Sequence, residues 1–327
     1  MAVYTQVPRD LVESFIAEYR VGRVSRYEGV AQGVENTNYI VHVDSESGPA
    51  KYVLTLFERR VRESDIPFYL AAMAHLAAAG APTPRPLATP SGDVIRTLCD
   101  RPAITITFLD GTPRVAPSPS DCQALGETLA RMHLAAEAFP KSRPNDLSIH
   151  GWNELAKACA ADADRCTPGL SALIDDELAY LNERWSAVTV GLKQGLIHAD
   201  LFPDNVFFED GQVSGVIDFY FSCTDYFAYD LAVTLNAWAQ HDGAWRRENA
   251  AALLSGYHAQ RSLSEKEKSA LPVFLRGSAL RFLLTRLYDW INQVEGAIVT
   301  VKDPVEYRDL LTFHRNAEST DLGLYDN

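Results

Sequence analysis

The segment LIHADLFPDNVFF, residues 196–208, places a histidine, two aspartates and an asparagine within eight residues, directly before an apolar run. Polar groups beside a strand-like stretch lose hydration when the chain folds, which costs free energy unless something uses them. Residues of these types can ligate a metal ion, approach a phosphate or accept a proton. The segment is therefore a candidate catalytic centre, and a well-capped turn is the alternative.

The spacing of these residues is more specific than their types. His198, Asp200 and Asn205 follow H-x-D-x-x-x-x-N, the pattern of the catalytic loop in protein kinases. After Asn205 the residues VFF predict a strand, EDGQ a turn and VSGVI a second strand that ends just before Asp218. Such a hairpin would return the chain to its start and set Asp218 beside Asn205.

Phosphoryl transfer is the chemistry that this arrangement favours. A hydroxyl nucleophile needs a carboxylate close to its proton, and Asp200 would serve as that base. The triphosphate of ATP needs Mg²⁺, which prefers oxygen ligands such as the Asn205 amide and the Asp218 carboxylate. His198 is predicted to bond the backbone near Asp218 and to hold the loop. A His-x-Asp pair alone can be structural or can ligate a transition metal in a hydrolase, but the full string favours a phosphotransferase.

The composition is that of an ordinary globular protein: 47% of the 327 residues are hydrophobic and 22% are charged. The length suits one large domain or two lobes. A formal net charge of −13 repels phosphate backbones, which argues against a nucleic-acid partner but permits a local ATP site. No stretch reaches the ~20 apolar residues of a membrane helix. Without a secretory signal or a CxxC pair among five scattered cysteines, a cytoplasmic setting is expected.

Hydrophobic periodicity divides the chain into a β-rich part and a helical part. The first part contains alternating stretches typical of strands and one capped helical stretch, and the second begins with a Ser/Asp helix start and is mainly helical. The predicted strands lie at 38–44, 51–58 and 102–111, and the first two are expected to pair as a hairpin across the turn residues between them. The predicted helices lie at 64–80 and from 118 onward. The Pro-rich junction at 111–120 predicts an α+β protein with a nucleotide-binding lobe at 1–110 and a catalytic and substrate-binding lobe at 111–327.

The first lobe should then hold the nucleotide. Gly33, Asn36 and Asn38 form a flexible, donor-rich turn before the first clear strand, and such a turn could cover phosphates. Backbone groups from Phe108 to Asp110, in ITFLDG, are placed to bond an adenine edge if this segment is the hinge.

Six segments carry a family resemblance: GVENTNYIV, ITFLDG, LGETLARMH, LIHADLFPDNVFF, GVIDFYF and YDLAVTLNAW, which span residues 33–238 in order. The chain resembles the aminoglycoside phosphotransferase-like kinases, which have a bilobal protein-kinase-like fold. Within that group its sequence is most similar to the homoserine kinases. The resemblance implies ATP and Mg²⁺ as cofactors and the side-chain hydroxyl of L-homoserine as acceptor, on the route to threonine. It also places the catalytic Asp on Asp200, the metal pair on Asn205 and Asp218, and the phosphate-covering loop around Gly33 to Asn38.

Kinases usually carry a lysine on the third strand, paired with a glutamate on the following helix. Here Thr55 occupies the expected lysine position, and the helical stretch PFYLAAMAHLAAAG contains no glutamate. The absence of both the lysine and the glutamate is chemically consistent, because a chain that kept only one of them would hold an uncompensated charge. Lys51 lies two pleats away on the same strand face and is a candidate to neutralise phosphate.

Homoserine is a zwitterion, so its site would need a cation and acceptors. Arg281 and Arg286, in GSALRFLLTRLYDW, are candidates for the carboxylate, and Tyr220, Asp225 and Asp230 for the ammonium. The alternatives are surface salt bridges for the arginines and a helix cap for Asp230.

Two other functions remain open at the level of sequence. One is a small-molecule kinase of the same fold that acts on an aminoglycoside, choline or a related amino alcohol. The other is a non-catalytic nucleotide-binding regulator, which only the missing strand lysine favours. Oligomeric state is not indicated.

Overall fold

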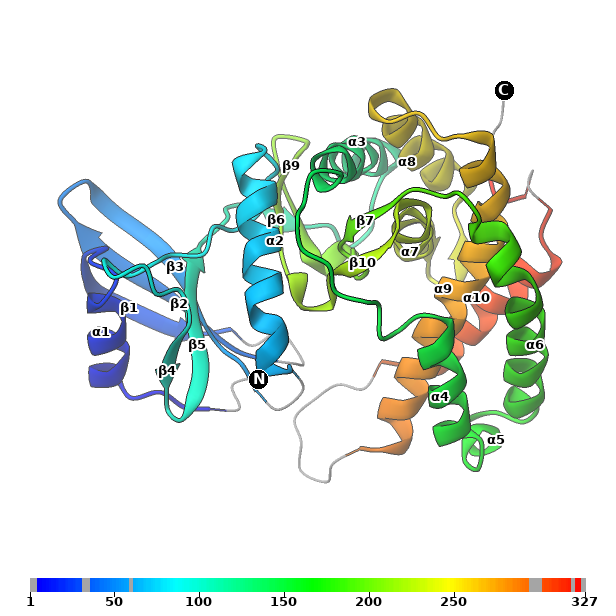
Figure 1. Ribbon diagram of the computed structural model, residues 1–327, viewed down its shortest axis with the longest axis horizontal. Coiled ribbons are helices and arrows are strands. Elements are labelled where there is room, and N and C mark those ends of the chain that lie inside the picture. Colours follow the sequence, from blue (N-terminus) through cyan, green and yellow to red (C-terminus); the bar gives the residue numbers. More distant parts are fainter. Residues whose placement is uncertain (1–4, 31–35, 59–60, 294–301, 319–320, 325–327) are drawn as a thin grey trace. The chain divides into compact units, whose positions relative to one another are not determined.

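The chain folds into two compact units, residues 1–110 and 111–327. The computed structural model describes residues 5–30, 36–58, 61–293, 302–318 and 321–324 (Figure 1). The first unit is built on an antiparallel sheet and the second is mainly helical, so the expected α+β composition is confirmed. No helix in the described part of the chain combines the length and apolar character needed to cross a membrane.

A five-stranded sheet in the order β1-β2-β3-β5-β4 forms the first unit, and all its neighbouring strands are antiparallel. Its elements are α1 (Arg9–Ala17), β1 (Arg23–Gly29), β2 (Thr37–Ser45), β3 (Gly48–Leu56), the 3₁₀ turn Glu63–Asp65, α2 (Ile66–Ala78), β4 (Arg96–Leu98) and β5 (Arg101–Thr107). The predicted hairpin is confirmed: β2 and β3 pair with Asn38 opposite Thr55 and His42 opposite Lys51.

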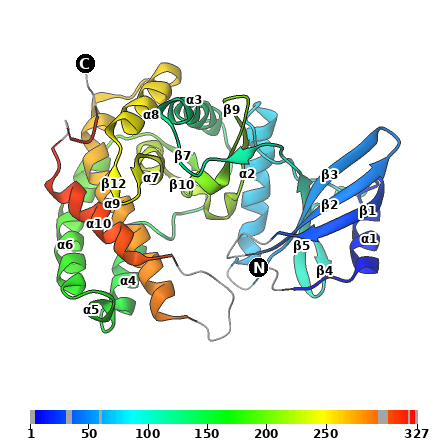
Figure 2. The ribbon, with the colours of Figure 1, turned by 180° about the vertical axis from the view of Figure 1, so that it is seen from behind.

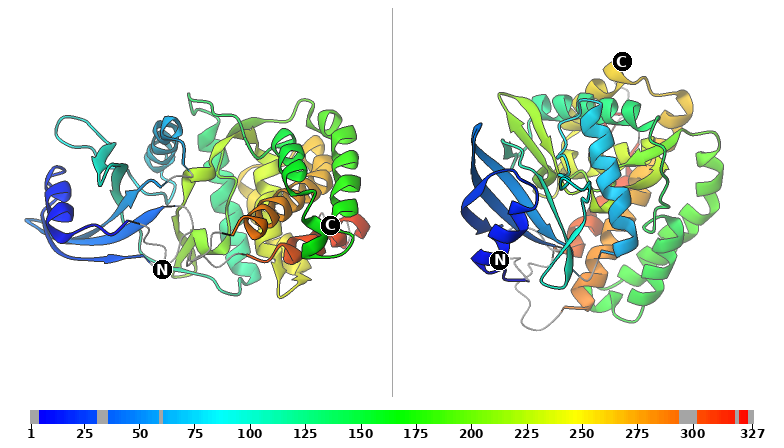
Figure 3. Two further views of the ribbon diagram at one scale, coloured as in Figure 1. Left: turned by 90° about the horizontal axis from the view of Figure 1, so that it is seen from below. Right: turned by 60° about the vertical axis from the view of Figure 1, so that its left-hand side comes forward.

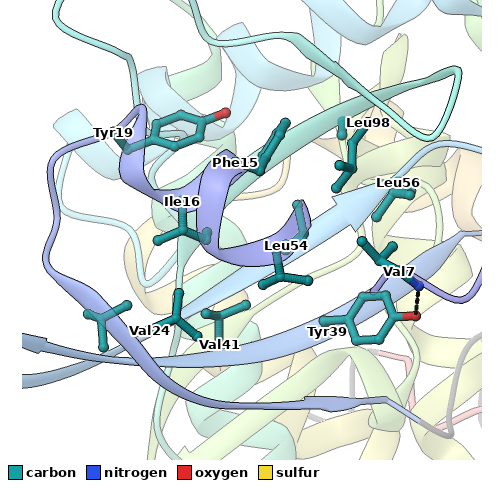
Figure 4. Packing of buried hydrophobic residues seen from close by; sticks show 13 residues of the cluster. Val7, Phe15, Ile16, Tyr19, Val24, Tyr39, Val41, Leu54, Leu56 and Leu98 are labelled. Carbon is teal, nitrogen blue, oxygen red and sulfur yellow. Dashed lines mark hydrogen bonds between the residues drawn. The ribbon is translucent and has the colours of Figure 1, made fainter. Parts of the chain in front are cut away.

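The core of this unit lies between one face of the sheet and α1 (Figure 4). Alternate residues of β2 and β3 point toward the helix, among them Val41 and Leu54, which are fully buried. The helix supplies Phe15 and Ile16 from its apolar side. Burial on this face leaves the other side chains of the same strands, including Asn38 and Thr55, on the opposite face.

The second unit surrounds a long helix, α9, with other helices and three small sheets. Its elements are β6 (Thr112–Pro113), α3 (Pro119–Ala136), α4 (Ile149–Cys159), α5 (Ala163–Cys166), α6 (Leu170–Thr189), β7 (Gln194–Ile197), the 3₁₀ turn Pro203–Asn205, β8 (Val206–Glu209), β9 (Gln212–Val216), the 3₁₀ turn Phe219–Phe221, β10 (Cys223–Tyr226), α7 (Phe227–Ala239), β11 (Gln240–His241), β12 (Ala244–Trp245), α8 (Arg247–Gln260), α9 (Glu265–Ile291) and α10 (Pro304–Asn316). The helix α9 contacts α4, α6, α7 and α10 (Figures 2 and 3).

Two glycines let α3 and α8 approach each other closely. A Cβ atom at Gly126 would lie 2.1 Å from the carbonyl oxygen of Leu253, and one at Gly256 would lie 2.2 Å from that of Gln123. Larger residues would therefore force the two helices apart. The close crossing matters for the site, because α3 and α8 each contribute a polar side chain to a buried network described below.

Three helices of the second unit are joined by a buried histidine. His314 of α10 donates from Nε2 to the Asn236 side chain of α7 at 2.7 Å, and the Asn236 amide donates to Ser278 of α9 at 2.6 Å. Burial lowers the pKa of His314 to about 3, and the nearby charge of Arg276 acts in the same direction. The ring is therefore neutral in the folded protein at ordinary pH.

We predict that this histidine makes stability depend on pH. The unfolded chain binds a proton on His314 near pH 6.5, whereas the folded chain does so only near pH 3, so the free energy of unfolding should fall as the pH is lowered between these values. The contribution is at most about 1.4 kcal/mol per pH unit for one proton. In denaturant titrations at pH 7.5, 6 and 5, the variant His314→Gln should show a shallower pH dependence than the wild type.

His150→Gln is the control, because His150 lies on an exposed helix surface. It should leave the pH dependence unchanged. An identical slope in wild type and His314→Gln would contradict the assignment of the titrating group.

Candidate active site

The catalytic-loop residues follow a short buried strand. The strand β7 contributes the buried side chains Leu196 and Ile197 and pairs with β10, with Ile197 opposite Cys223. His198 follows Ile197 directly and is itself buried. The two-stranded sheet thus fixes where the loop begins.

The predicted hairpin after Asn205 is confirmed. The strands β8 and β9 pair with Val206 opposite Val216, and a tight turn at Asp210 and Gly211 has positive φ at both residues. The pairing continues past the strand ends, because the Ile217 amide donates to the Asn205 carbonyl at 3.0 Å. Asp218 therefore comes directly after the residue paired with Asn205, as its position in the sequence predicted.

His198 joins the loop to the end of the hairpin. Its Nε2 donates to the carbonyl of Ile217 at 2.9 Å, which confirms the predicted contact with the backbone beside Asp218. Its Nδ1 accepts the Asp200 amide at 3.3 Å, and its ring packs against Phe219 with ring centres 4.7 Å apart. One ring nitrogen donates and the other accepts, so the imidazole is neutral, consistent with burial lowering the pKa of His198.

Asp200 and Asn205 contact each other directly. The Asn205 amide nitrogen donates to the Asp200 carbonyl at 2.9 Å and lies 3.3 Å from its carboxylate. Burial raises the pKa of Asp200, and the charges of Arg281 and Lys302 oppose that increase. The site therefore holds a carboxylate that protein surrounds while nearby cations favour its ionised form.

The donor set of Asn205 and Asp218 fits a hard cation. The amide nitrogen of Asn205 is used within the loop, which leaves its oxygen as the atom that can meet a metal. Asp218 adopts a left-handed backbone conformation, with φ 65° and ψ 61°, at the end of the hairpin. One amide and one carboxylate oxygen suit Mg²⁺, which takes few protein ligands and completes its shell with phosphates and water. Among the described residues, no group of three or more His, Cys, Asp and Glu could hold a metal ion.

Asp230 was expected to contact a substrate, and the structure corrects this expectation. Its carboxylate, at the start of α7, accepts the Ala199 amide at 2.7 Å and the His198 amide at 3.0 Å. It also accepts Nε2 of His133 at 3.0 Å, and it is fully buried. Burial alone would raise the pKa of Asp230, but the hydrogen bond from His133 and the contacts with the loop outweigh it and lower the pKa. Asp230 thus fixes the backbone of the catalytic loop, because the start of α7 lies beside the end of β7.

Arg281 and Arg286 of α9 also find partners inside the protein. Arg281 is buried and donates from Nη1 to the Ala199 carbonyl. Arg286 pairs with Glu306 of α10 at 2.5 Å and donates to the Asp303 carbonyl at 3.1 Å. Arg286 therefore already has a carboxylate partner, supplied by α10, which sequence spacing could not reveal.

Tyr220 and Asp225 follow the candidate metal ligand. Tyr220 lies in the 3₁₀ turn after Asp218 and is partly exposed. Asp225 is buried on β10, where it accepts the Asn145 side-chain amide at 2.7 Å and the Tyr226 backbone amide at 2.8 Å. Burial raises the pKa of Asp225, and these hydrogen bonds oppose the increase.

In the first unit, the candidate phosphate-binding residues are tied to the sheet. The Asn38 side chain accepts the Thr55 hydroxyl at 2.7 Å, so the position of the usual strand lysine holds a neutral hydrogen-bonded pair. Asn36 is buried and accepts the Glu58 amide at 3.3 Å. Gly33 lies outside the described residues.

The candidate hinge residues gather around Lys51. The Lys51 ammonium pairs with the Asp110 carboxylate and lies 4.0 Å from the centre of the Phe108 ring. The Phe108 amide lies 3.4 Å from the Lys51 carbonyl, which continues the pairing of β3 with β5. Lys51 therefore has partners at the end of β5.

Sequence reasoning missed two groups around the loop. Lys302 lies 3.8 Å from Asp204, 5.0 Å from the Phe202 ring centre and close enough to Asp200 to influence its charge. His133 of α3 bonds Asp230 at 3.0 Å, a contact that the sequence did not indicate. Residues near the loop in sequence do not indicate either contact, because Lys302 and His133 come from segments remote in sequence. The one pointer to His133 was its place at the end of the segment LGETLARMH, which carries the family resemblance.

Comparison with known proteins identifies the family. Residues 26–263 match the model of the phosphotransferase enzyme family. A homoserine kinase from Methylobacterium sp. (strain 4-46) is 48% identical over 316 residues, covering 96% of each chain. A homoserine kinase from Xanthobacter autotrophicus (strain ATCC BAA-1158 / Py2) is 48% identical over 326 residues, covering 99% of each chain.

Solved structures show the same fold at low sequence identity. A spectinomycin phosphotransferase superposes with a TM-score of 0.70 at 14% identity, covering 96% of this chain and 98% of the other. An amicoumacin kinase superposes with a TM-score of 0.67 at 15% identity, covering 94% and 93%. The chain therefore belongs to the phosphotransferase enzyme family, in the branch that its homoserine kinase relatives occupy, and it is an enzyme with the protein-kinase-like α+β fold.

Proposed function

We propose that this enzyme transfers the γ-phosphoryl group of ATP to the side-chain hydroxyl of L-homoserine and forms O-phospho-L-homoserine and ADP. The hydroxyl oxygen forms a bond to the γ-phosphorus while the bond from that phosphorus to the β–γ bridging oxygen breaks. The proton of the hydroxyl passes to the carboxylate of Asp200. The bridging oxygen leaves with ADP.

One observation supports this chemistry above the alternatives. The register of the β8–β9 hairpin brings Asp218 next to the residue paired with Asn205, and Asn205 bonds Asp200. Asn205 and Asp218 are proposed to hold Mg²⁺, which when bound would neutralise charge on the phosphate oxygens. His198 is proposed to keep the loop in place through its bonds to Ile217 and Asp200.

The choice of acceptor rests on the relatives. Homoserine kinases match nearly the whole chain at 48% identity, whereas the kinases of known structure that act on antibiotics share only the fold. We propose Asp225 and Tyr220 as acceptors for the substrate ammonium. Lys302, a cation beside the catalytic loop, is proposed to meet the substrate carboxylate in place of Arg286.

Nucleotide binding is proposed for the first unit. Asn36 and Asn38, together with Gly33, would contact phosphates, and backbone groups from Phe108 to Asp110 would bond the adenine edge. Because Thr55 and Asn38 form a neutral pair, no strand cation at that position needs a glutamate partner.

We predict that L-homoserine stimulates ATP turnover and that choline and aminoglycosides do not. The measurement is a coupled assay of ADP release with each alcohol at matched concentrations, followed by identification of the phosphorylated product. Turnover of another alcohol with none for L-homoserine would refute the acceptor and retain the kinase. Absence of transfer to every alcohol, with ATP still bound, would favour a nucleotide-binding regulator instead.

Asp200→Asn is predicted to lower kcat by at least ~10²-fold, since general-base catalysis contributes on that order. Binding of ATP, followed by calorimetry, should change little, because the variant keeps the size and the main-chain contacts of the loop. Asp175→Asn is the control: it removes an exposed carboxylate from α6, outside the loop. Retention of full activity by Asp200→Asn would remove that residue from its proposed role.

Asp218→Asn is predicted to raise the Mg²⁺ concentration needed for half-maximal activity by at least ~10-fold, because it replaces a charged ligand with a neutral one. The measurement is a magnesium titration at saturating ATP and acceptor, with thermal unfolding to monitor the fold. Asp210→Asn alters the turn of the same hairpin and serves as control, since Asn also tolerates the positive φ found there. Equal magnesium requirements in the two variants would argue against Asp218 as a ligand.

A further inference from the structure

The residue between the loop histidine and the candidate base has an unfavourable backbone conformation. Ala199 has φ 64°, in the left-handed region, where an L side chain brings Cβ too close to the following carbonyl oxygen. It is 1% exposed, so water does not complete its hydrogen bonds. A non-glycine residue keeps such a conformation only where its surroundings hold it there.

The peptide plane between Ala199 and Asp200 is held on both edges. On one edge its carbonyl oxygen accepts Nη1 of Arg281, and on the other its N–H donates to Nδ1 of His198 at 3.3 Å. The amide on the other side of Ala199 donates to Asp230 at 2.7 Å. Relaxation of Ala199 to negative φ would reorient the peptide planes on both sides of it, and these contacts to Asp230, Arg281 and His198 would break.

Arg281 reaches the Ala199 carbonyl from a distant part of the sequence. It lies on α9, a helix remote in sequence from the loop, and is 1% exposed. Its guanidinium lies 4.4 Å from the centre of the Phe282 ring and 5.7 Å from that of Phe221. A buried cation costs desolvation free energy, so its position next to the Ala199 carbonyl is a strong constraint on both partners.

We propose that Arg281 is a positioning residue of the reaction: by holding the peptide between Ala199 and Asp200 it aims the Asp200 carboxylate at the acceptor hydroxyl. The inference rests on the proposed function, because it takes Asp200 as the base. It differs from the role in substrate binding that the sequence suggested for Arg281. Metal and nucleotide ligands are other residues, so loss of Arg281 should reduce the rate of transfer more than the affinity for ATP.

The test compares buried Arg281 with Arg276, a half-buried arginine of the same helix. Arg281→Gln removes the reach and charge needed to hold the Ala199 carbonyl, whereas Arg276→Gln weakens a buried ion pair with Glu177 on α6. We expect Arg281→Gln to lower kcat by at least ~10-fold, as a misplaced catalytic group does, with KM for ATP within about 2-fold. Arg276→Gln should lower the midpoint of thermal unfolding and keep kcat.

A second substitution separates positioning from general destabilisation. Glycine has no Cβ to oppose the left-handed conformation, so Ala199→Gly in the Arg281→Gln background should recover several-fold in kcat. If Arg281→Gln does not fold, Arg281→Lys is compared with its own Ala199→Gly double variant in the same way. Unchanged kcat in the single variant, or no recovery in the double variant, would overturn the proposal.

Hydrogen exchange makes the result independent of the acceptor. Loss of Arg281 should speed exchange of the amides of residues 198–200, and loss of Arg276 should not. Faster exchange in that segment would support the role of Arg281 in holding this peptide even if the wild type proves to use an alcohol other than homoserine. Equal exchange in both variants would refute it.

Discussion

The hydrogen bonds from the catalytic loop to the buried carboxylate of Asp230 are the constraint on which the arrangement of the candidate site depends. This carboxylate lies at the start of α7, has no exposure and accepts the backbone amides of His198 and Ala199. A buried carboxylate is stable only when its oxygens are occupied, and buried amides need acceptors just as strictly. The loop and the helix therefore satisfy one another, and neither can move without leaving a buried polar group unpaired.

A network of hydrogen-bonded side chains from other helices holds this carboxylate in place. His133 of α3 donates to Asp230 and accepts the Tyr257 hydroxyl of α8 at 2.8 Å, and that hydroxyl accepts Arg261 at 3.1 Å. Arg261 pairs in turn with Glu267 at 2.7 Å, and Glu267 closes the N-terminal cap of α9 with Ser264. Three helices are thus connected to the catalytic loop through hydrogen bonds in a low-dielectric interior, where such bonds are strong when fully satisfied. The close crossing of α3 and α8 at two glycines is what allows His133 and Tyr257 to meet.

Features governed by short-range rules could be predicted. The hairpin between Asn205 and Asp218 depends on alternation, a turn with Asp and Gly, and a fixed register, so the approach of these two residues followed from counting. The strand pairing of β2 with β3 and the capped start of α3 followed in the same way. The bond from His198 to the backbone beside Asp218 was also predictable, because the hairpin returns the chain to that point.

Features governed by the packing of remote segments could not be predicted. Asp230 and Arg286 have residue types that suit substrate binding, yet one braces the loop and the other pairs with Glu306. The sequence by itself determined the reaction class and the family, because the catalytic spacing and hairpin are local and the relatives match nearly the full chain. Only the tertiary structure decided which charged residues face the loop and which serve the fold. Charges have long reach and no periodicity, so their partners depend on how helices far apart in sequence pack together.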